Sequence, residues 1–365
     1  MRGTAFDSAA ITADAITLAE LPGGTGHEAL RINWLERRLA GAPGRRHVDD
    51  VGNLVWTFGP PPYRLALLVH VDDVFAETTA RDISERDGWL CGPGIGDNAI
   101  AVATTVAVAG RDLVPPGGSA EFSLAIVFTV GEEGLGALRG ARHACGELQP
   151  GAVLALEGHG VGRVFTTAVG SLRARLTVTG PGGHSWWDRG RPSAVHELVR
   201  VLHAMVAAAP AGLSVNVGLV DGGTGVNAIA GRASATVEWR STDPAALRRQ
   251  DATLAGPEVS PGLRLSVERL DSRPAGPVPL SHPFVAAVLR ARRSVGLPVT
   301  TADGSTDAIP ALAADIPALA LGCCAGENMH AQDERILAES ISVGAGQLHA
   351  VLAEILELTP SAARD

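Results

Sequence analysis

Four short apolar runs, each followed by residues that can bind a metal ion, constrain the fold of this chain more than any other feature. Their length and β-branched content are typical of buried strands. Helix-like segments lie between them, among them residues 97–110 and 282–296. This alternation predicts an α/β fold, a mainly parallel sheet covered by helices, with its binding site where the strands end. The runs are RLALLV at 64–69, SLAIVFTV at 123–130, AVLAL at 152–156 and IPALALG at 316–322.

The polar residues that follow these runs have the composition of a metal site. A single His or Glu in a loop is usually solvated or hydrogen-bonded. Several carboxylates gathered at one sheet edge, however, repel one another unless a cation neutralises them. Imidazole with carboxylate suits zinc, cobalt or manganese and leaves room for a catalytic water. The residues are His70, Asp72, Glu132, Glu133, Glu157 and His330, together with Asp97 from the glycine-rich loop CGPGIGDN.

A ligand set of two histidines and three of these carboxylates exceeds the needs of one tetrahedral zinc ion but suffices for two metals if one carboxylate bridges. Asp97, a short carboxylate in a tight loop, is the natural bridge. Adjacent side chains at a strand end diverge, so Glu132 and Glu133 are expected to have different tasks. If Glu133 is a ligand, Glu132 can face the metal-bound water as general base. Asp72 lies two residues after His70 and can orient a ligand; its alternative is an ordinary surface carboxylate.

From about residue 168 the pattern changes to β-α-β-β-α-β, the ferredoxin-like arrangement. This segment lies between the third and fourth ligand-bearing runs. We therefore predict an inserted domain at 168–275 that divides a catalytic domain into 1–167 and 276–365. The loop GPGGHSWWDRG inside the insert carries His184, for which a functional role and an ordinary hydrogen-bonded role remain equally open.

The composition of the chain narrows the classes of binding partner that we expect. The chain has 365 residues, 46% hydrophobic and 19% charged, which is enough for two domains. Its formal net charge of -9 argues against nucleic acid or an anionic membrane as partner, so a small molecule or peptide is expected. The N-terminus shows no uninterrupted signal-peptide core, and the apolar run at 99–110 is too short to span a bilayer, so we expect a cytoplasmic protein. The four cysteines show no disulfide framework.

The motifs together resemble the co-catalytic zinc metallopeptidase family that includes carboxypeptidase G, peptidase T, aminoacylase and succinyl-diaminopimelate desuccinylase. The sequence GEEGLGALRGARH is most similar to the peptidase T-like branch. The resemblance covers nearly the whole chain, with the motifs in the family's order. They are HVDD, GPGIGDN, TVGEEGLG, GPGGHSWWDRGRPSA, GGTGVNAIAGRASATVEWRS and GSTDAIPALAADIPALALG followed by MHAQDE.

The resemblance implies two divalent metal ions, zinc in the first place, with cobalt or manganese as alternatives. Glu132 would be the general base, and Asp72 would orient a ligand. Asp97 would bridge the two ions. The remaining ligands would be His70 and Glu157 for one ion, and Glu133 and His330 for the other.

The resemblance also implies roles for the inserted domain, which usually mediates dimerisation in this family. His184 would stabilise the oxyanion of the tetrahedral intermediate, reaching the site from the partner subunit of a homodimer. Asn227 and Arg240 match positions that bind the substrate backbone or carboxylate, a task for which Arg is well suited. Glu238 stands where the family usually has Asp, a conservative difference.

The leading hypothesis is a two-metal hydrolase of exopeptidase or aminoacylase type. It would cleave an amide bond in a small peptide or N-acyl amino acid, with metal-bound hydroxide as nucleophile and Glu132 as general base. One alternative is a tailoring amidase for a specialised metabolite, with which the paired Trp186 and Trp187 are compatible. Another is a non-catalytic binding relative, against which the intact ligand set counts.

Overall fold

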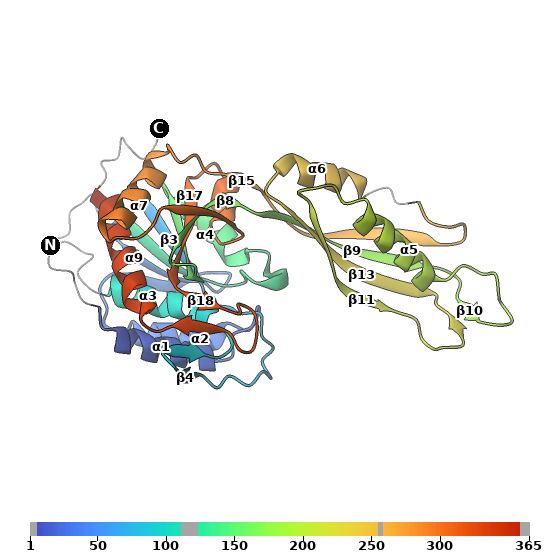
Figure 1. The fold of residues 1–365 in the computed structure, drawn as a ribbon, viewed down its shortest axis with the longest axis horizontal. Helices are drawn as coiled ribbons and strands as arrows, with labels where there is room; N and C mark the ends of the chain where they lie inside the picture. Colours follow the sequence, from blue (N-terminus) through green and yellow to red (C-terminus); the bar gives the residue numbers. More distant parts are fainter. Residues whose placement is uncertain (1–5, 111–122, 255–257, 358–365) are drawn as a thin grey trace. The chain divides into compact units, whose positions relative to one another are not determined.

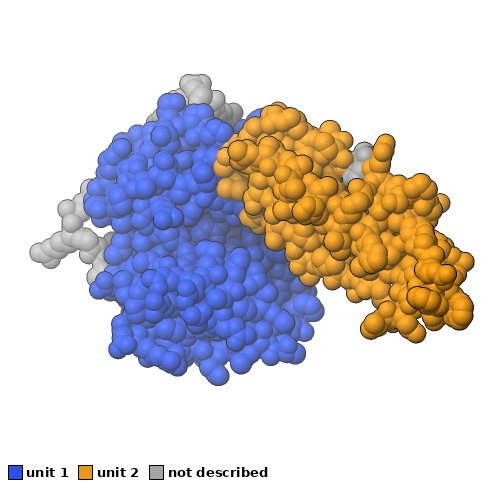
Figure 2. All heavy atoms as spheres, turned by 45° about the vertical axis from the view of Figure 1, so that its right-hand side comes forward, with its two compact units in different colours: residues 1–168, 277–365 blue, residues 169–276 orange. Residues whose placement is uncertain are grey.

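A computed structural model of the protein describes residues 6–110, 123–254 and 258–357 and divides the chain into two compact units (Figures 1 and 2). Unit 1 consists of Met1–Ala168 and Pro277–Asp365, and unit 2 of Val169–Gly276. No helix within the described residues is long and apolar enough to cross a membrane.

The nine-stranded sheet of unit 1 has four parallel strands at its centre, which correspond to the four apolar runs of the sequence. All residues of the central strands β3 and β6 are buried, as in parallel sheets covered on both faces. The predicted α/β fold with a mainly parallel sheet is therefore confirmed. In order across the sheet, the central strands are β6 (Leu124–Thr129), β3 (Leu65–His70), β7 (Val153–His159) and β17 (Ala318–Cys324).

The outer strands complete this sheet on both sides. Antiparallel β2 joins β6 and is followed by β1, whereas antiparallel β8 joins β17. Strand β16 pairs in parallel with β8, and β15 lies next to β8 in the sheet order. Their bounds are β1 (Arg45–Val48), β2 (Leu54–Phe58), β8 (Arg163–Ala168), β15 (Gly276–Pro277) and β16 (Thr300–Gly304).

Side chains of the central strands alternate between two cores, one on each face of the sheet. Leu65 and Leu67 of β3 belong to the larger core, and Ala66 and Leu68 to the smaller one. The larger core is covered by α1 (Ser8–Glu20), α2 (Ala29–Arg38), α3 (Ile100–Ala109), α7 (Pro283–Ser294) and α9 (Ser340–Glu357). The smaller core is covered by α4 (Arg139–Leu148) and α8 (Ile309–Ala313).

The helix expected from Asp97 begins later, at Ile100. Residues Ile95–Ala99 form an irregular turn, in which Asp97 has φ -117° and ψ 91°, outside the helical region. Two contacts hold this turn away from helical geometry. The Asn98 side chain donates to the carbonyl oxygen of Leu156 (3.0 Å). The turn also lies against β7 so closely that a Cβ at Gly158 would stand 1.6 Å from the Gly96 carbonyl oxygen.

A small four-stranded antiparallel sheet joins the loop of Asp97 to the loop of His330. The hairpin of β18 and β19 carries His330, and β5 leads directly into the glycine-rich loop. Arg335 of β19 pairs with Cys91 of β5, which sets the two loops side by side. The sequence analysis did not predict this sheet. Its strands are β4 (Ser84–Arg86), β5 (Trp89–Cys91), β18 (Gly326–Glu327) and β19 (Arg335–Leu337).

Unit 2 is a four-stranded antiparallel sheet with two helices, in strand order β11-β13-β9-β14. Its own core includes Leu198 of α5, Leu247 of α6 and Trp239 of β13, so both helices pack on the sheet (Figure 1). The ferredoxin-like prediction is confirmed. The elements are β9 (Gly170–Thr179), α5 (Ala194–Ala207), β11 (Ser214–Gly222), β13 (Arg232–Ser241), α6 (Pro244–Thr253) and β14 (Arg264–Arg273), with a short pair, β10 (Gly183–His184) and β12 (Ala228–Ile229).

Candidate metal centre

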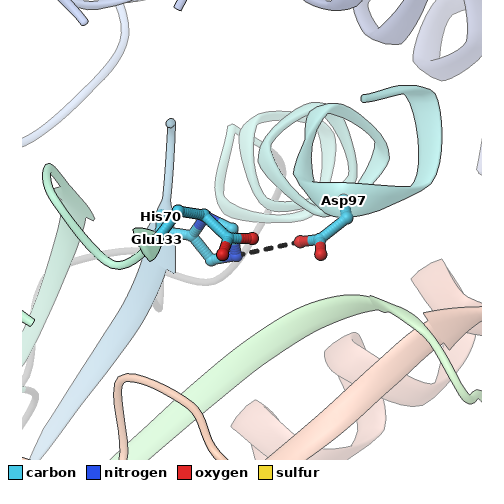
Figure 3. Close-up of side chains that lie close together, drawn as sticks. All are labelled: His70, Asp97 and Glu133. Carbon is cyan, nitrogen blue, oxygen red and sulfur yellow. Dashed lines mark ion pairs between the residues drawn. The ribbon is translucent and has the colours of Figure 1, made fainter. Parts of the chain in front are cut away.

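The polar residues predicted from the strand ends gather at one edge of the central sheet. His70 ends β3, Glu132 and Glu133 follow β6, and Glu157 lies in β7. The sheet order β6-β3-β7 makes these strands neighbours, and Asp97 faces them from the turn before α3. One ligand atom each from His70, Asp97 and Glu133 lies within 4.8 Å of the other two (Figure 3).

Asp97 presents one carboxylate oxygen to each of two histidines. Its Oδ1 lies 3.1 Å from Nε2 of His70, and its Oδ2 lies 2.9 Å from Nε2 of His330. Each histidine has a further carboxylate beside it. Glu157 Oε2 lies 3.4 Å from Nε2 of His70, and Glu133 Oε1 lies 3.0 Å from Nε2 of His330. One carboxylate therefore lies between two imidazoles, and each imidazole has one further carboxylate beside it.

The donor set fits two divalent ions. A nitrogen and an oxygen bound to one tetrahedral zinc ion, each at about 2.0–2.1 Å, stand about 3.3 Å apart. The nitrogen–oxygen separations around Asp97, between 2.9 and 3.4 Å, are close to that value. Imidazole and carboxylate are also the ligand types that zinc, cobalt and manganese accept. The residues present therefore suit the ions that the sequence predicts.

In the metal-free protein, the imidazoles balance the charge of the carboxylates. Hydrogen bonds to Asp97 and Glu133 raise the pKa of His330 to about 10. Burial alone would raise the pKa of Asp97, but its contacts with His330 and His70 hold it well below the usual range. Burial also raises the pKa of Glu133. A metal ion that binds here must displace protons from the histidines and take over their role of compensating negative charge.

Asp72 connects His70 to both adjacent glutamates. Nδ1 of His70 lies 3.0 Å from the Asp72 carbonyl oxygen, which can only accept, so Nδ1 carries the proton and Nε2 is left to face a cation. The Asp72 carboxylate accepts the backbone N–H of Glu132 at Oδ1 and that of Glu133 at Oδ2, each at 3.0 Å. Burial opposes ionisation of Asp72, but His70 and these amides outweigh it and lower its pKa.

Glu132 and Glu133 are both buried, at 6% and 7% exposed. Glu133 offers a carboxylate oxygen within 4.8 Å of a ligand atom of both His70 and Asp97. The different tasks that the divergence of neighbouring side chains predicts for the two glutamates stay a prediction.

His184 lies in unit 2, in the short strand β10, and is exposed. Its Nδ1 accepts the backbone N–H groups of Trp186 (3.2 Å) and Trp187 (3.3 Å). A neutral imidazole that accepts at Nδ1 carries its proton at Nε2. His184 thus presents a donor at Nε2, while both tryptophans are exposed, Trp187 by 78%.

The two residues predicted to bind substrate also lie in unit 2. Asn227 is next to the His184 loop, since its carbonyl oxygen accepts the backbone N–H of Ser185 (2.9 Å). Arg240 lies on β13, where its Nε donates to Glu238 on the same strand at 2.7 Å. A substrate carboxylate at Arg240 would have to compete with Glu238.

A buried histidine–glutamate pair behind the Asp97 loop was not predicted from the sequence. Nε2 of His159 lies 2.7 Å from Oε1 of Glu334, whose Oε2 accepts the backbone N–H of Gly94 at 2.7 Å. Gly96 fits against this pair, since a Cβ there would stand 2.2 Å from His159 Nε2. Glu334 lies four residues after His330 in the motif MHAQDE, and this position is the one sequence signal for Glu334. No local sequence pattern predicts its pairing with His159.

A second missed residue is Asp307, in the motif GSTDAIPAL. It is 1% exposed, and its Oδ2 accepts the hydroxyl of Thr129, the residue that pairs with His70 across β6 and β3. Within the described residues, its Oδ1 has no hydrogen-bond partner. Burial raises the pKa of Asp307 to about 7.

The fold and this cluster define a hydrolase of the metallopeptidase and amidohydrolase class. The chain belongs to Peptidase family M20/M25/M40, whose profile matches residues 66–354. Membership of this family implies divalent metal ions, and the buried His, Asp and Glu cluster offers a place for them.

Solved structures share the fold over almost the entire chain. A tripeptidase from Staphylococcus aureus is 20% identical, with a TM-score of 0.77, covering 97% of this chain and 100% of that one. Human carnosine dipeptidase 1 is 14% identical, with a TM-score of 0.71 and coverage of 96% and 97%. An amidase of the hydantoinase/carbamoylase family from Burkholderia phymatum is 19% identical, with a TM-score of 0.62 and coverage of 96% and 98%. A comparison with curated proteins gives no match.

Proposed function

We propose that this protein is a two-metal hydrolase that cleaves an amide bond in a small peptide or an N-acyl amino acid. The observation that carries the proposal is the Asp97 carboxylate, whose two oxygens face His70 and His330 separately. Structural neighbours named as a tripeptidase, a dipeptidase and an amidase support amide cleavage as the reaction class.

In this proposal, each ion has one histidine, one glutamate and a share of Asp97. His70 and Glu157 would hold one ion, and His330 and Glu133 the other. Bound divalent ions supply Lewis acidity, which polarises the amide carbonyl and lowers the pKa of water. The charge of the buried carboxylates is then balanced without protons on the histidines.

Glu132 is the proposed general base. Its backbone N–H is fixed by Asp72 Oδ1 at 3.0 Å, and the residue is 6% exposed and precedes Glu133 in the chain. In this role its carboxylate would take the proton of the attacking water and then deliver it to the leaving amine.

Unit 2 would contribute recognition and oxyanion stabilisation. The Nε2–H of His184, with Nδ1 occupied by backbone N–H groups, suits donation to the developing oxyanion. Following the family resemblance, we propose that the partner subunit of a homodimer supplies it. Asn227 and Arg240 would bind the substrate backbone or carboxylate.

Product analysis tests the proposed reaction. Zinc- or cobalt-reconstituted protein is incubated with mixed dipeptides, tripeptides and N-acyl amino acids, and products are identified by mass spectrometry. Cleavage that disappears after EDTA treatment is expected, and the products identify the preferred bond. Metal-independent cleavage, or none with metal bound across all these substrates, would count against the proposal.

A first prediction separates the two adjacent glutamates. Glu132→Gln removes the base while preserving shape, so we expect unchanged zinc content and a fall in kcat of about 10²–10⁴-fold. Glu133→Ala removes a ligand, so zinc content is expected to fall. Atomic absorption and steady-state kinetics measure the two effects.

The exposed Glu36 provides a matched control, because Glu36→Gln makes the same chemical change on the surface of α2. Near-normal turnover in Glu132→Gln would show that the base is another group. Full zinc content in Glu133→Ala would remove Glu133 from the ligand set.

A further inference from the structure

We propose that the hydroxyl group of Thr25 positions the metal centre by fixing Asp72, an inference that rests on the proposed metal function. Thr25 lies in the segment between α1 and α2, outside the residues that match the family profile. Its Oγ1 donates to Oδ2 of Asp72 at 2.8 Å and lies 3.3 Å from the carbonyl oxygen of Glu133. One hydroxyl thus touches the turn after β3 and the turn after β6.

Asp72 is the residue through which this contact reaches the ligands. It is fully buried, and its carboxylate accepts the backbone N–H groups of Glu132 and Glu133. Its carbonyl oxygen accepts Nδ1–H of His70. Rotation of this carboxylate would therefore disturb the backbone of both glutamates and the contact of its Oδ1 with Nδ1 of His70, 3.7 Å away. Thr25 adds a third donor that holds the carboxylate plane, and hydrogen bonds to ionised acceptors are strong ones.

The segment that carries Thr25 is itself held firmly on the loop after β3. The Gly23 carbonyl oxygen accepts the backbone N–H of Asp73 (3.0 Å), and the Leu21 carbonyl oxygen accepts Nε of Arg31 (3.1 Å). Gly24 lies so near this loop that a Cβ would stand 2.6 Å from the carbonyl oxygen of Phe75. The Thr25 hydroxyl is therefore attached to a fixed backbone. A group that positions Asp72, which in turn orients His70, must itself be fixed.

The guanidinium of Arg31 strengthens the same attachment from within the core. It is 1% exposed, it pairs with the buried carboxylate of Asp73, and its Nη1 donates to the carbonyl oxygen of Val71 at 2.6 Å. The segment and Arg31 of α2 together therefore contact the chain on both sides of Asp72. Movement of Thr25 away from Asp72 would require breaking these buried contacts as well.

The test compares variants that differ only in the hydroxyl. Thr25→Val keeps the shape and removes the donor, and Thr25→Ser keeps the donor. Because loss of a partner that orients ligands typically costs about 10–100-fold in metal affinity, we expect zinc affinity to fall by that factor in Thr25→Val and by less than about threefold in Thr25→Ser. Affinity is measured by competition with a chromophoric chelator on EDTA-treated protein. The absorption spectrum of the cobalt-loaded protein reports the coordination geometry.

Thr17→Val is the matched control, because its exposed hydroxyl donates only within α1, to the Ala13 carbonyl oxygen. We expect it to bind zinc like the unaltered protein. If Thr25→Val does not fold, as judged by circular dichroism, Thr25→Ala is compared with Thr25→Ser in its place.

The outcomes separate this inference from the function on which it rests. Weak binding and an altered cobalt spectrum in Thr25→Val, with both restored in Thr25→Ser, support it. Equal zinc affinity in the unaltered protein and Thr25→Val overturns the role of Thr25 alone. Equally weak binding in both Thr25 variants shows that the methyl group and packing matter, and overturns the role of the hydroxyl. Failure of the unaltered protein to bind zinc overturns the proposed metal function, and this inference with it.

Discussion

Glu132 and Glu133 are chemically identical neighbours in the chain, and we propose different tasks for them. Asp72 accepts one backbone N–H from each, so a single buried carboxylate fixes both. Glu133 lies 3.0 Å from Nε2 of His330 and offers a ligand atom to the group that includes His70 and Asp97. Adjacent side chains at a strand end diverge, which is the physical reason for expecting a different task for Glu132.

The pH dependence of stability provides a prediction at Asp307, whose pKa burial raises to about 7. At low pH the carboxyl is protonated in both folded and unfolded chains. As pH rises from about 4 to about 7, the unfolded chain releases its proton more readily, so this residue increasingly favours unfolding. Asp307→Asn removes this effect. In EDTA-treated protein, we expect the advantage of the variant over the unaltered protein in free energy of unfolding to be on the order of 4 kcal/mol larger at pH 8 than at pH 4.

Urea unfolding at several pH values measures this difference, with Asp82→Asn as the control at an exposed aspartate. A variant whose stability followed that of the unaltered protein at every pH would show that Asp307 is ionised without penalty in the folded state.

The sequence indicated His70, Glu132, Glu133 and Glu157 because each follows an apolar run, where parallel strands bring side chains to one edge. Asp97 was indicated by its glycine-rich loop, and His330 by the loop after the last run. Thr25 and Asp307 had no such signal. Thr25 contacts a residue 47 positions away, and Asp307 contacts one 178 positions away. A threonine or aspartate in a loop is so common that only the folded chain reveals which ones are partners.

At the scale of elements, the long strands and helices were predictable, and the short ones were not. Strand β3 and the helix α7 begin within a residue of the segments expected from the sequence. The small sheet of β4, β5, β18 and β19 escaped prediction because strands of two or three residues have no measurable periodicity. This sheet nevertheless places the His330 loop beside the Asp97 loop.

The buried pair of His159 and Glu334 should stabilise this junction, and a double-mutant cycle tests it. Their side chains are 9% and 0% exposed, so removing either residue leaves the other buried without its side-chain partner. We expect each single substitution to alanine to cost about 3–5 kcal/mol in free energy of unfolding, and the double substitution to cost much less than the sum.

The exposed pair of Asp243 and Arg249 serves as the control cycle, because such surface pairs contribute about 0–1 kcal/mol. Measurements are made by urea unfolding of EDTA-treated protein. Additive costs at His159 and Glu334 would mean that the two side chains stabilise the protein independently.

At the scale of the whole molecule, the proposed sharing of His184 between subunits makes a distinctive prediction. Glu132→Gln and His184→Ala should each be nearly inactive alone. If the partner subunit supplies His184, a mixed dimer of the two variants contains one site with both Glu132 and His184 intact. We therefore expect the mixture to regain activity. If the subunits pair at random, the activity should reach about a quarter of that of the unaltered protein.

Mixing after mild dissociation, followed by activity and mass measurements, tests this directly. Two samples of the same variant, mixed in the same way, are the control. Absence of recovery despite mass-verified mixed dimers would place His184 in the site of its own chain, or outside the site altogether. The cytoplasmic location stays a prediction.

The order of the clustered residues along the chain has a consequence for protein synthesis. His70, Asp97, Glu133 and Glu157 are all made before unit 2, whereas His330 comes after it. Under the proposed ligand assignment, the position of His70 and Glu157 has all its ligands in the chain made before unit 2. The position of His330 and Glu133 would be completed only after translation has passed residue 330.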